Sequence, residues 1–381
     1  MKVLLAGLPR MAEFDFIVIG AGIAGASVAA HLAEHASVAV LDMEERAGYH
    51  TTGRSAASYE PNYGPPAILA LTRASRGFFV SPPKGFAEAP IFTKRGSMVL
   101  EPRNQSTPAR PFLSGDANVH ELGLDAMLQL VPILRPDYAA RGFYDDSTGD
   151  LDVDLLHRGF LRLFKQRGGK LNLSAATQEI ARVNGAWRVA TPAGSFSAKT
   201  MINAAGAWGD VVAMLGSVAP IGLIPKRRSI GVIPVEGYSD FMNWPMMVDV
   251  DETWYAKPQS GKLIVSSADA TPVEPHDAYA DDEAIALGID RLMQATTMDV
   301  KRLEHSWAGL RTFSPDGSPV VGFDPSTEDF FWLVGQGGYG IQSSWGLSRL
   351  ASALAMRDAV PEDLLAEGLL IDNVLPERFY K

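Results

Sequence analysis

The chain has 381 residues, 46% of them hydrophobic and 20% charged, which is typical of a globular protein with two or three domains. Its formal net charge is −10, so there is no overall basic field that would attract nucleic acid or anionic lipid. There is no cysteine, which excludes disulfides, thiolate metal ligands and catalytic thiols, and we expect no metal site.

No stretch reaches the roughly 18 uninterrupted apolar residues of a membrane span. The most apolar stretch, residues 211–225, is interrupted by Gly216, Pro220 and Gly222, so we expect no integral membrane segment. Residues 1–12 hold a short apolar run with no cleavage motif after it, and we expect a leader outside the fold. We expect a cytoplasmic protein, with peripheral contact at the inner membrane as the alternative.

The front of the chain predicts a strand, a helix and a second strand. Residues 16–19 form a short apolar run of the buried-strand type, and an alanine-rich helix follows to about residue 35. Residues 38–41 are again apolar and predict the next strand. This is the pattern of a βαβ unit.

A glycine-rich fingerprint joins the first strand to this helix. Gly20 permits a tight turn, Gly22 lets the backbone approach a pyrophosphate, and Gly25 lets the helix pack closely on the strand. Asp42 follows the second strand, 22 residues after Gly20, where its carboxylate can bind ribose hydroxyls. This context predicts a bound dinucleotide, either FAD or NAD.

Two later segments favour FAD over NAD. The polar loop at residues 51–58 supplies Thr, Ser and Arg groups that can line phosphates or a flavin edge, although a surface loop has the same composition. A strand at residues 330–334 ends in the glycine-rich segment 335–340, and we expect a helix from Ile341 to about Met356. The positive N-terminus of that helix would suit the negative charge of a reduced flavin.

The remaining segments predict a second domain. Residues 200–203 form another buried strand, which ends in a small-residue turn of the kind that approaches a ligand closely. Residues 91–100, 229–235 and 262–266 instead alternate like antiparallel strands. We expect a discontinuous dinucleotide-binding domain with a mostly antiparallel domain inserted in two parts.

Five motifs in this order resemble the FAD-dependent D-amino acid oxidase family. They lie at residues 20–25, 53–57, 203–208, 307–311 and 336–342, within a resemblance that runs from about Phe14 to Met356. The chain is most similar to the D-arginine dehydrogenase and D-amino acid dehydrogenase branch. The resemblance implies FAD as cofactor and the oxidation of amino acids or secondary amines.

The resemblance also implies the fold. We expect a Rossmann-like α/β FAD-binding domain of the glutathione-reductase type, formed by residues 13–85, 151–222 and 306–381. An inserted α+β substrate domain, built on a mostly antiparallel sheet, is expected at residues 86–150 and 223–305.

The resemblance assigns the cofactor-binding residues one by one. They are Gly20, Gly22, Ile23, Ala24, Gly25, Asp42, Thr52, Arg54, Ser55, Ala56, Val183, Ala205, Gly206, Gly309, Gly337, Gly338, Tyr339, Gly340, Ile341 and Gln342. His50 resembles the histidine to which some sarcosine- and dimethylglycine-type relatives attach their flavin covalently. In the D-arginine branch that position carries no bond, and we expect non-covalent FAD.

Two arginines are the candidates for binding a substrate carboxylate. Residues 226–228 alone have the composition of a solvated basic run, but in a strand at 229–235 Arg228 shares a face with Ile230 and Val232. Arg311 precedes the last strand, where an interdomain ion pair is the alternative. The resemblance assigns Arg228 and Arg311 to the carboxylate and Tyr255 to the hydroxyl that joins them.

The resemblance places other residues around the substrate. Tyr63 and Ser58 lie in a loop where related enzymes have a lid, and Gly338 matches the backbone carbonyl that receives the amine. Met246 and Val248 match apolar walls of the side-chain pocket, although core packing is their default role.

The side-chain pocket departs from the branch. Members that prefer D-Arg and D-Lys carry a carboxylate at the position of Ser97, and a hydroxyl cannot neutralise a desolvated cation. Glu60 could replace that carboxylate if it turned inward, but we expect a surface glutamate. Neutral or hydrophobic D-amino acids are therefore the expected substrates.

The expected reaction is oxidative deamination, as in amino acid catabolism, which yields a 2-oxo acid and ammonia after hydride transfer to the flavin. Alternatives are a glycine, sarcosine or imino acid oxidase or dehydrogenase, the flavin subunit of a heteromeric amine dehydrogenase, and an NAD-dependent dehydrogenase. The expected partners are a small amino acid and an electron acceptor, either a quinone or oxygen, and no nucleic acid.

Overall fold

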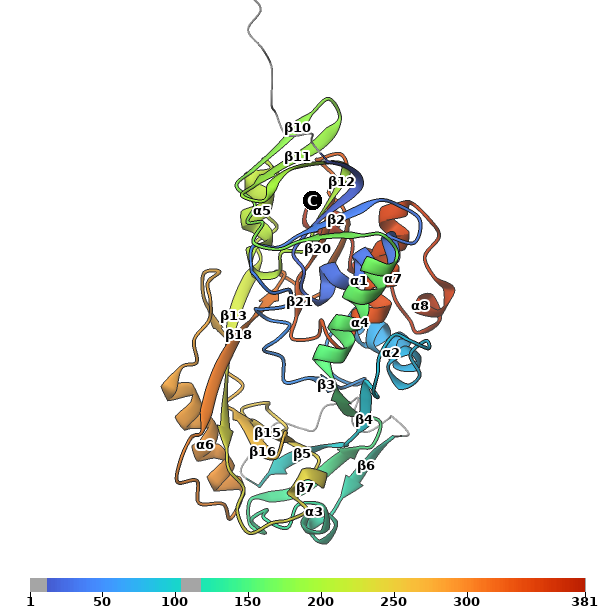
Figure 1. The fold of residues 1–381 in the computed structure, drawn as a ribbon. Coiled ribbons are helices and arrows are strands. Elements are labelled where there is room, and N and C mark those ends of the chain that lie inside the picture. The colour runs from blue at the N-terminus through green and yellow to red at the C-terminus, as the bar shows by residue number, and fades with distance from the viewer. Residues whose placement is uncertain (1–11, 104–117, 381) are drawn as a thin grey trace, which may run out of the picture.

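Two large β-sheets dominate the computed structural model, which describes residues 12–103 and 118–380 (Figure 1). The predicted leader lies outside the described residues, except for Ala12. Ala12 begins the first strand, so the leader prediction is wrong at that residue.

The first sheet has eight strands. They are β1 (Ala12–Ile19), β2 (Val38–Leu41), β9 (Lys170–Asn172), β10 (Glu179–Val183), β11 (Ala186–Thr191), β12 (Gly194–Asn203), β19 (Val320–Phe323) and β20 (Phe330–Val334). Strands β9, β2, β1, β12 and β20 are parallel neighbours, while β10, β11 and β19 pair antiparallel. The carboxyl ends of the parallel strands therefore share one edge, which is where such sheets bind ligands.

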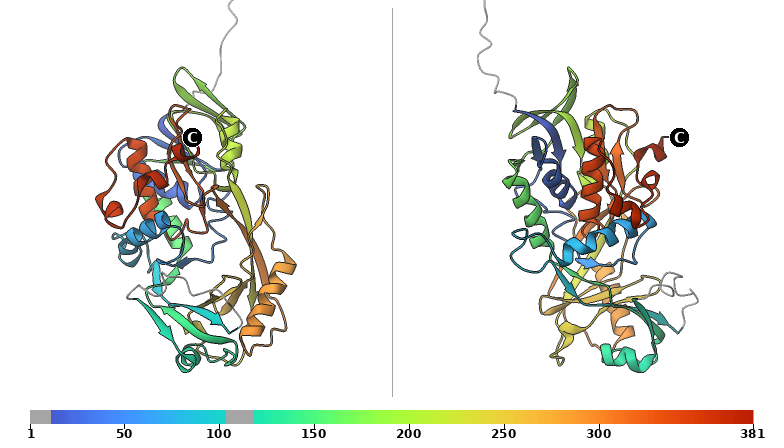
Figure 2. Two further views of the ribbon diagram at one scale, coloured as in Figure 1. Left: turned by 180° about the vertical axis from the view of Figure 1, so that it is seen from behind. Right: turned by 90° about the vertical axis from the view of Figure 1, so that its right-hand side faces the viewer.

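Helices cover one face of this sheet. They are α1 (Ile23–Leu32), α2 (Pro66–Val80), α4 (Val153–Gln166), α7 (Ser344–Met356) and α8 (Glu362–Ala366). Helix α1 packs between α4 and α7, as the side view in Figure 2 shows. Along β1, Phe16 and Val18 pack toward these helices, and Ile17 and Ile19 join a core on the opposite face. That core also contains α5 (Gly209–Leu215), which follows the 3-10 helix η2 (Gly206–Trp208).

The second sheet has ten strands. They are β5 (Ser97–Pro102), β6 (Val119–Leu122), β7 (Ala139–Asp145), β13 (Ile224–Ile233), β14 (Met246–Asp249), β15 (Tyr255–Gln259), β16 (Lys262–Ser266), β17 (Thr271–Pro272), β18 (His305–Phe313) and β21 (Gln336–Gly337). All neighbours pair antiparallel except β14 and β5. Helices α6 (Asp282–Ala295) and α3 (Leu124–Leu130) pack on it.

Short elements complete the structure. A small antiparallel sheet contains β3 (Ser58–Tyr59), β8 (Gly149–Leu151) and β4 (Phe92–Lys94). The remaining 3-10 helices of the described chain are η3 (Phe241–Asn243), η4 (Ile371–Asn373) and η5 (Pro376–Phe379).

The structure differs from the predicted boundaries at two places. Strand β18 pairs with β13 along nine residues, so residues 306–313 belong to the ten-stranded sheet and not to the nucleotide-binding part. Figure 1 shows both strands running from the upper part of the molecule into the lower part. Helix α7 begins at Ser344, three residues after the expected Ile341, because turns closed by Tyr339 and Ile341 carbonyls precede it.

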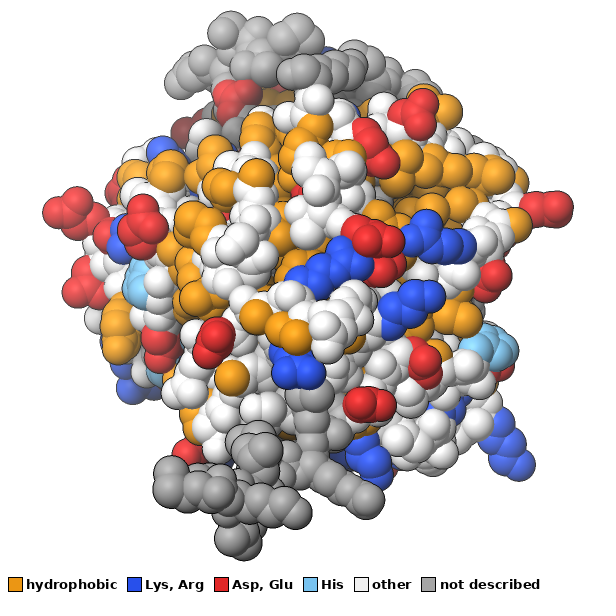
Figure 3. Space-filling view, turned by 90° about the horizontal axis from the view of Figure 1, so that it is seen from above, with side chains coloured by type: hydrophobic (Ala, Val, Ile, Leu, Met, Phe, Trp, Pro, Cys, Tyr) orange, Lys and Arg blue, Asp and Glu red, His pale blue; other side chains and the backbone are white. Residues whose placement is uncertain are grey.

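No helix of residues 12–103 and 118–380 is both long and apolar enough to cross a membrane. The face seen in Figure 3 carries acidic and basic side chains interspersed among apolar ones, with no patch of a single sign.

Candidate active site

Two adjoining cavities lie where the two large sheets meet. The first has a volume of about 270 Å³ and the second about 140 Å³. The residues that line both are Ser55, Ala56, Arg228, Arg311, Gly338 and Ile341. A ligand in one cavity can therefore contact a ligand in the other.

The first cavity begins at the glycine-rich turn after β1. Gly20 has φ of +103°, and a Cβ on it would lie 2.5 Å from the Ala204 carbonyl oxygen. Helix α1 has no side-chain cap at Gly22, and Gly22 and Ile23 both line the cavity. The Thr52 hydroxyl accepts a hydrogen bond from the Ile23 amide at 2.9 Å. An open helix N-terminus in a cavity suits a pyrophosphate.

Asp42 lies at the end of β2 and lines the same cavity. Its carboxylate accepts hydrogen bonds from the amides of Ala21 at 2.6 Å and Glu44 at 2.9 Å. Burial raises the pKa of this carboxyl, against the effect of the two amides. The position suits the ribose hydroxyls of a dinucleotide whose phosphates lie at α1.

Most of the residues predicted to hold FAD line this first cavity. They are Gly20, Gly22, Ile23, Ala24, Asp42, Thr52, Arg54, Ser55, Ala56, Ala205, Gly206, Gly309, Gly337, Gly338, Gly340 and Ile341. The cavity runs from the ribose position at Asp42 to the arginines of the second sheet. The shape of the first cavity and its hydrogen-bond donors therefore fit FAD.

Four predicted residues lie elsewhere. Gly25 serves packing, because a Cβ on it would lie 1.9 Å from the Gly20 carbonyl oxygen. Gln342 lines the second cavity, and Tyr339 packs against Tyr63 with ring centroids 5.1 Å apart. Val183 is a correction: it ends β10 in a hairpin, paired with Ala186, and lines neither cavity.

Sequence reasoning missed part of the nucleotide site. Ala175, Ala176 and Thr177 line the first cavity beyond β9, a strand of only three residues. These residues follow a strand that ends at the ligand-binding edge of the sheet, and that strand could have pointed to them. A strand of three residues gives no clear hydrophobic pattern, so the sequence did not predict it. His50 also lines this cavity, and its Nε2 atom lies 2.8 Å from a Glu44 oxygen.

Arg54 fastens the polar loop to the second sheet. Its guanidinium donates to the carbonyls of Ala278 and Ala308 and pairs with Asp277. The Thr51 hydroxyl donates to the Leu310 carbonyl at 2.7 Å. The loop is thereby held against β18, beside both cavities.

Strand pairing explains why two arginines meet in the second cavity. Lys226 pairs with Arg311, and Arg228 pairs with Gly309, between antiparallel β13 and β18. Paired residues share a face, as do residues two apart on one strand, so Arg228 and Arg311 lie on the same face. Arg228 and Arg311 each line the first and the second cavity.

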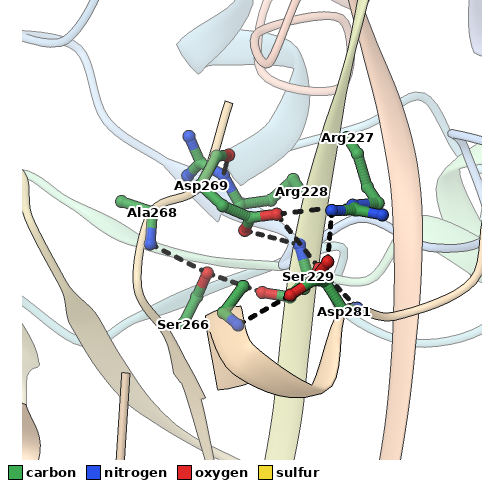
Figure 4. Close-up of polar contacts among 8 residues, drawn as sticks. Arg227, Arg228, Ser229, Ser266, Ala268, Asp269 and Asp281 are labelled. Carbon is green, nitrogen blue, oxygen red and sulfur yellow. Dashed lines mark hydrogen bonds and ion pairs between the residues drawn. The ribbon is translucent and has the colours of Figure 1, made fainter. Parts of the chain in front are cut away.

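A polar network holds Arg228 (Figure 4). Its Nε donates to the Asp269 carbonyl at 2.7 Å, while the Asp269 carboxylate accepts from the amide and hydroxyl of Ser229. Arg227, on the other face of β13, pairs with Asp281 at 2.6 Å. Burial, and then the charge of Arg311, lower the pKa of Arg228. Two buried guanidinium groups side by side favour the entry of an anion.

Tyr255 lies beside these arginines on β15. Its buried hydroxyl has no hydrogen-bond partner among residues 12–103 and 118–380, and the Arg228 guanidinium carbon lies 5.9 Å from its ring centroid. A buried hydroxyl without a partner is costly unless a ligand supplies one. The hydroxyl of Tyr63 donates to Glu252 at 3.4 Å.

All nine residues predicted to bind substrate line the second cavity. They are Ser58, Tyr63, Ser97, Arg228, Met246, Val248, Tyr255, Arg311 and Gly338. Parallel pairing of β14 with β5 aligns Met246 with Ser97 and Val248 with Val99, which form one wall. The hydroxyl of Ser58 lies 3.7 Å from the Met246 sulfur.

Glu60 is a correction. It was expected on the surface, but it lines the second cavity. Burial, and then the Asp145 carboxylate, raise the pKa of Glu60 to about 8. The cavity therefore contains an acid group besides the arginine clamp.

Comparison with known families identifies the chain. The model of the DAO family, described as FAD dependent oxidoreductase, matches residues 15–354. The chain belongs to the DAO family. The predicted family, the fold and the FAD cofactor are thereby confirmed.

Its relatives differ in what they oxidise. The chain is 24% identical over 258 residues to human mitochondrial dimethylglycine dehydrogenase, covering 62% of this chain but only 29% of that protein. It is 23% identical to glycine oxidase of Bacillus licheniformis, covering 85% and 88%. It is 28% identical to D-amino acid dehydrogenase of Xylella fastidiosa, covering 59% and 50%.

Solved structures agree on the fold. L-proline dehydrogenase from P. horikoshii superposes with a TM-score of 0.81 at 17% sequence identity, covering 98% of this chain and 99% of that one.

Proposed function

We propose that this DAO protein oxidises D-amino acids with neutral side chains to 2-oxo acids and ammonia. The observation that supports this best is the meeting of Arg228, Arg311 and the unpaired Tyr255 hydroxyl in a cavity that adjoins the FAD cavity. Bound FAD supplies the hydride acceptor. Water then converts the imine of the oxidised amino acid to the 2-oxo acid.

Arg228, Arg311 and Tyr255, which we call the carboxylate clamp, orient the substrate. Arg228 and Arg311 bind the carboxylate with charge-assisted hydrogen bonds, and the hydroxyl of Tyr255 donates a further one. The Gly338 carbonyl accepts the amine. A Cβ at position 338 would lie 2.8 Å from the carbon of the Arg311 guanidinium, so a side chain there would displace this arginine from the substrate carboxylate.

Positioning and water exclusion supply the acceleration. Tyr63 and Tyr339 pack edge to face beside the clamp and limit the entry of water. In this proposal no side chain removes a proton from Cα, and the substrate amine must be deprotonated before it reacts. Activity should therefore rise with pH as the substrate amine loses its proton.

The apolar wall supports a neutral side chain. Met246, Val248 and Val99 line it, and Ser97 stands where the D-arginine branch has a carboxylate. The relative named D-amino acid dehydrogenase supports the D configuration.

Anaerobic mixing with amino acids tests the function. We expect neutral D-amino acids to bleach the visible flavin absorbance, and their L-isomers, sarcosine and glycine to leave it unchanged. Arg228→Met and Arg311→Met should each weaken apparent substrate binding roughly 10- to 100-fold, because one charge-assisted hydrogen-bond pair is lost. Arg302→Met, at an exposed arginine paired with Glu304, is the matched control and should have no effect.

The other outcomes are equally informative. Bleaching by glycine or sarcosine alone would contradict D-amino acid oxidation and favour a secondary-amine enzyme, as the relatives glycine oxidase and dimethylglycine dehydrogenase suggest. No bleaching by any amine would contradict the proposal and favour a flavin subunit that needs a second protein. The acceptor, quinone or oxygen, and the cellular location stay predictions.

A further inference from the structure

Glu60 is the one carboxyl group of the second cavity whose backbone is fixed from the far end of the described chain. Its amide donates to the Gln342 side-chain oxygen at 3.1 Å, and the Gln342 amide group donates to the Glu60 carbonyl at 3.3 Å. Gln342 also donates to the Tyr63 carbonyl. The loop that carries Glu60 is therefore held at the cavity, beside the turn that precedes α7.

The charges around Glu60 already balance one another. Lys257 on β15 donates to Asp150 at 2.9 Å, and Arg95 pairs with the same carboxylate at 2.6 Å. Asp145 on β7 accepts from the Asn62 side chain at 2.9 Å and from Ser147. An ionised Glu60 would add an uncompensated negative charge beside Asp145.

The carboxyl group of Glu60 is therefore protonated at neutral pH, in agreement with its pKa of about 8. It then carries one O–H donor and one carbonyl acceptor. The Ser97 hydroxyl also interacts with it. The other titratable residues that line this cavity are Tyr63, Asp145, Arg228, Asp249, Glu252, Tyr255 and Arg311.

We propose that Glu60 recognises the end of the substrate side chain, and that the cavity selects D-amino acids ending in a carboxamide over hydrophobic ones of the same length. This inference rests on the proposed oxidation of D-amino acids. A carboxamide and a neutral carboxyl group match through two hydrogen bonds, one in each direction. An aliphatic or thioether end leaves the carboxyl group without a partner.

A cationic side chain behaves differently. It binds well only to ionised Glu60, so the carboxyl proton must leave first. The efficiency of flavin reduction by D-arginine, relative to that by D-glutamine, should therefore increase as the pH rises through about 8. The titration of the α-amine affects both substrates alike and cancels in this ratio.

The test compares D-glutamine, D-methionine and D-arginine by the rate constant of anaerobic flavin reduction divided by the apparent substrate dissociation constant. The protein with bound FAD should prefer D-glutamine to D-methionine by about 10-fold or more. Glu60→Leu should abolish or reverse that preference. Glu60→Gln should keep it, but the ratio of D-arginine to D-glutamine should no longer change between pH 6.5 and 9. Glu88→Leu, at a glutamate outside both cavities, is the matched control.

A failure of this inference can be distinguished from a failure of the proposed function. If D-amino acids reduce the flavin but Glu60→Leu leaves the glutamine-to-methionine ratio unchanged, this inference is wrong and the proposed function stands. If no D-amino acid reduces the flavin of the unmodified protein, the proposed function itself is wrong.

Thermal unfolding gives a readout that needs no substrate and covers the case in which Glu60→Leu does not fold. The raised pKa means that folded Glu60 keeps a proton that the unfolded chain releases above about pH 4.3. Wild-type stability should fall relative to Glu60→Gln as the pH rises from about 4.5 to 8. A constant difference would contradict a protonated Glu60.

Discussion

The carboxylate clamp is built from groups that the protein leaves without sufficient partners. Arg228 and Arg311 are both cationic and lie on one sheet face, and the Tyr255 hydroxyl has no partner in the described part of the chain. Asp269 accepts from Arg228 through its backbone carbonyl, while its carboxylate accepts from the amide and hydroxyl of Ser229. A substrate carboxylate would supply both the missing negative charge and the missing acceptor.

Tyr255→Phe should separate binding from stability. Because no described residue bonds to the hydroxyl, its loss should change the melting temperature of the protein without substrate little or raise it slightly. The apparent dissociation constant of a D-amino acid should rise about 10-fold, since one hydrogen bond to a charged group is lost. Substrate titration of flavin reduction and a thermal melt check the two halves. A large fall in the melting temperature would show that the hydroxyl has a partner in the folded protein.

Single residues were predictable where a periodic pattern or a motif fixed their direction. Arg228 lies on an alternating strand, and its face followed from the positions of Ile230 and Val232. Glu60 had no such pattern, because its inward direction depends on Gln342, which is 282 residues away in the chain. Local sequence does not encode that contact.

Helices α1 and α7 meet at a buried imidazole. His31 on α1 lies with its ring centroid 4.9 Å from that of Trp345 on α7, and its Nε2 atom is buried with no hydrogen-bond partner among the residues that the structure describes. Burial, and then the positive charges of Arg167 and Arg349, lower the pKa of His31 to about 4. The folded protein therefore holds His31 neutral at pH values where the unfolded chain protonates it.

Stability should depend on His31 between pH 6.5 and 4. The unfolded chain binds the extra proton in that range, so stability is present above pH 6.5 and is lost as the pH falls. The slope should be at most about 1.4 kcal/mol per pH unit. His31→Phe should remove this slope from urea unfolding measured at several pH values, and His35→Phe, at an exposed histidine, should retain it. Equal slopes in the two variants would mean that His31 is protonated in the folded state.

Element type was predictable from sequence, and pairing partners were less so. The front βαβ unit and the strand at 330–334 lie where their apolar runs predicted them. Strand β18 alternates like any half-buried strand, and only its pairing with β13 shows that it belongs to the second sheet. Pairing of distant strands is a property of the folded chain, so the boundary at residue 306 was misplaced.

On the scale of the whole molecule, the loop 51–57 joins the two large sheets. It lines both cavities. The side chains of Arg54 and Thr51 donate to backbone carbonyls of β18, and the Lys257 side chain of β15 donates to the Ala56 carbonyl. Ala57, within the loop, has φ of +60°, a conformation that alanine adopts only when its surroundings impose it. The resemblance predicted this loop as an FAD contact, but not what holds it.

Lys257 is a buried cation that binds the residue before Ala57. It is 2% exposed, and its ammonium donates to the Ala56 carbonyl at 2.5 Å and to Asp150 at 2.9 Å. Lys257→Met should cost about 3 kcal/mol of unfolding free energy, because Asp150 and the Ala56 carbonyl both lose a buried partner. FAD should also bind more weakly, because Ala56 lines its cavity.

Urea unfolding and FAD titration by flavin fluorescence measure the two effects. Lys262→Met removes a partly exposed lysine on β16 that pairs with Glu304, the residue before β18, and should cost less than about 1 kcal/mol with no change in FAD affinity. If Lys257→Met matched this control in stability, the buried ion pair would contribute nothing net. If it lost stability but kept its FAD affinity, the ammonium would stabilise the sheet junction without shaping the loop at the cofactor.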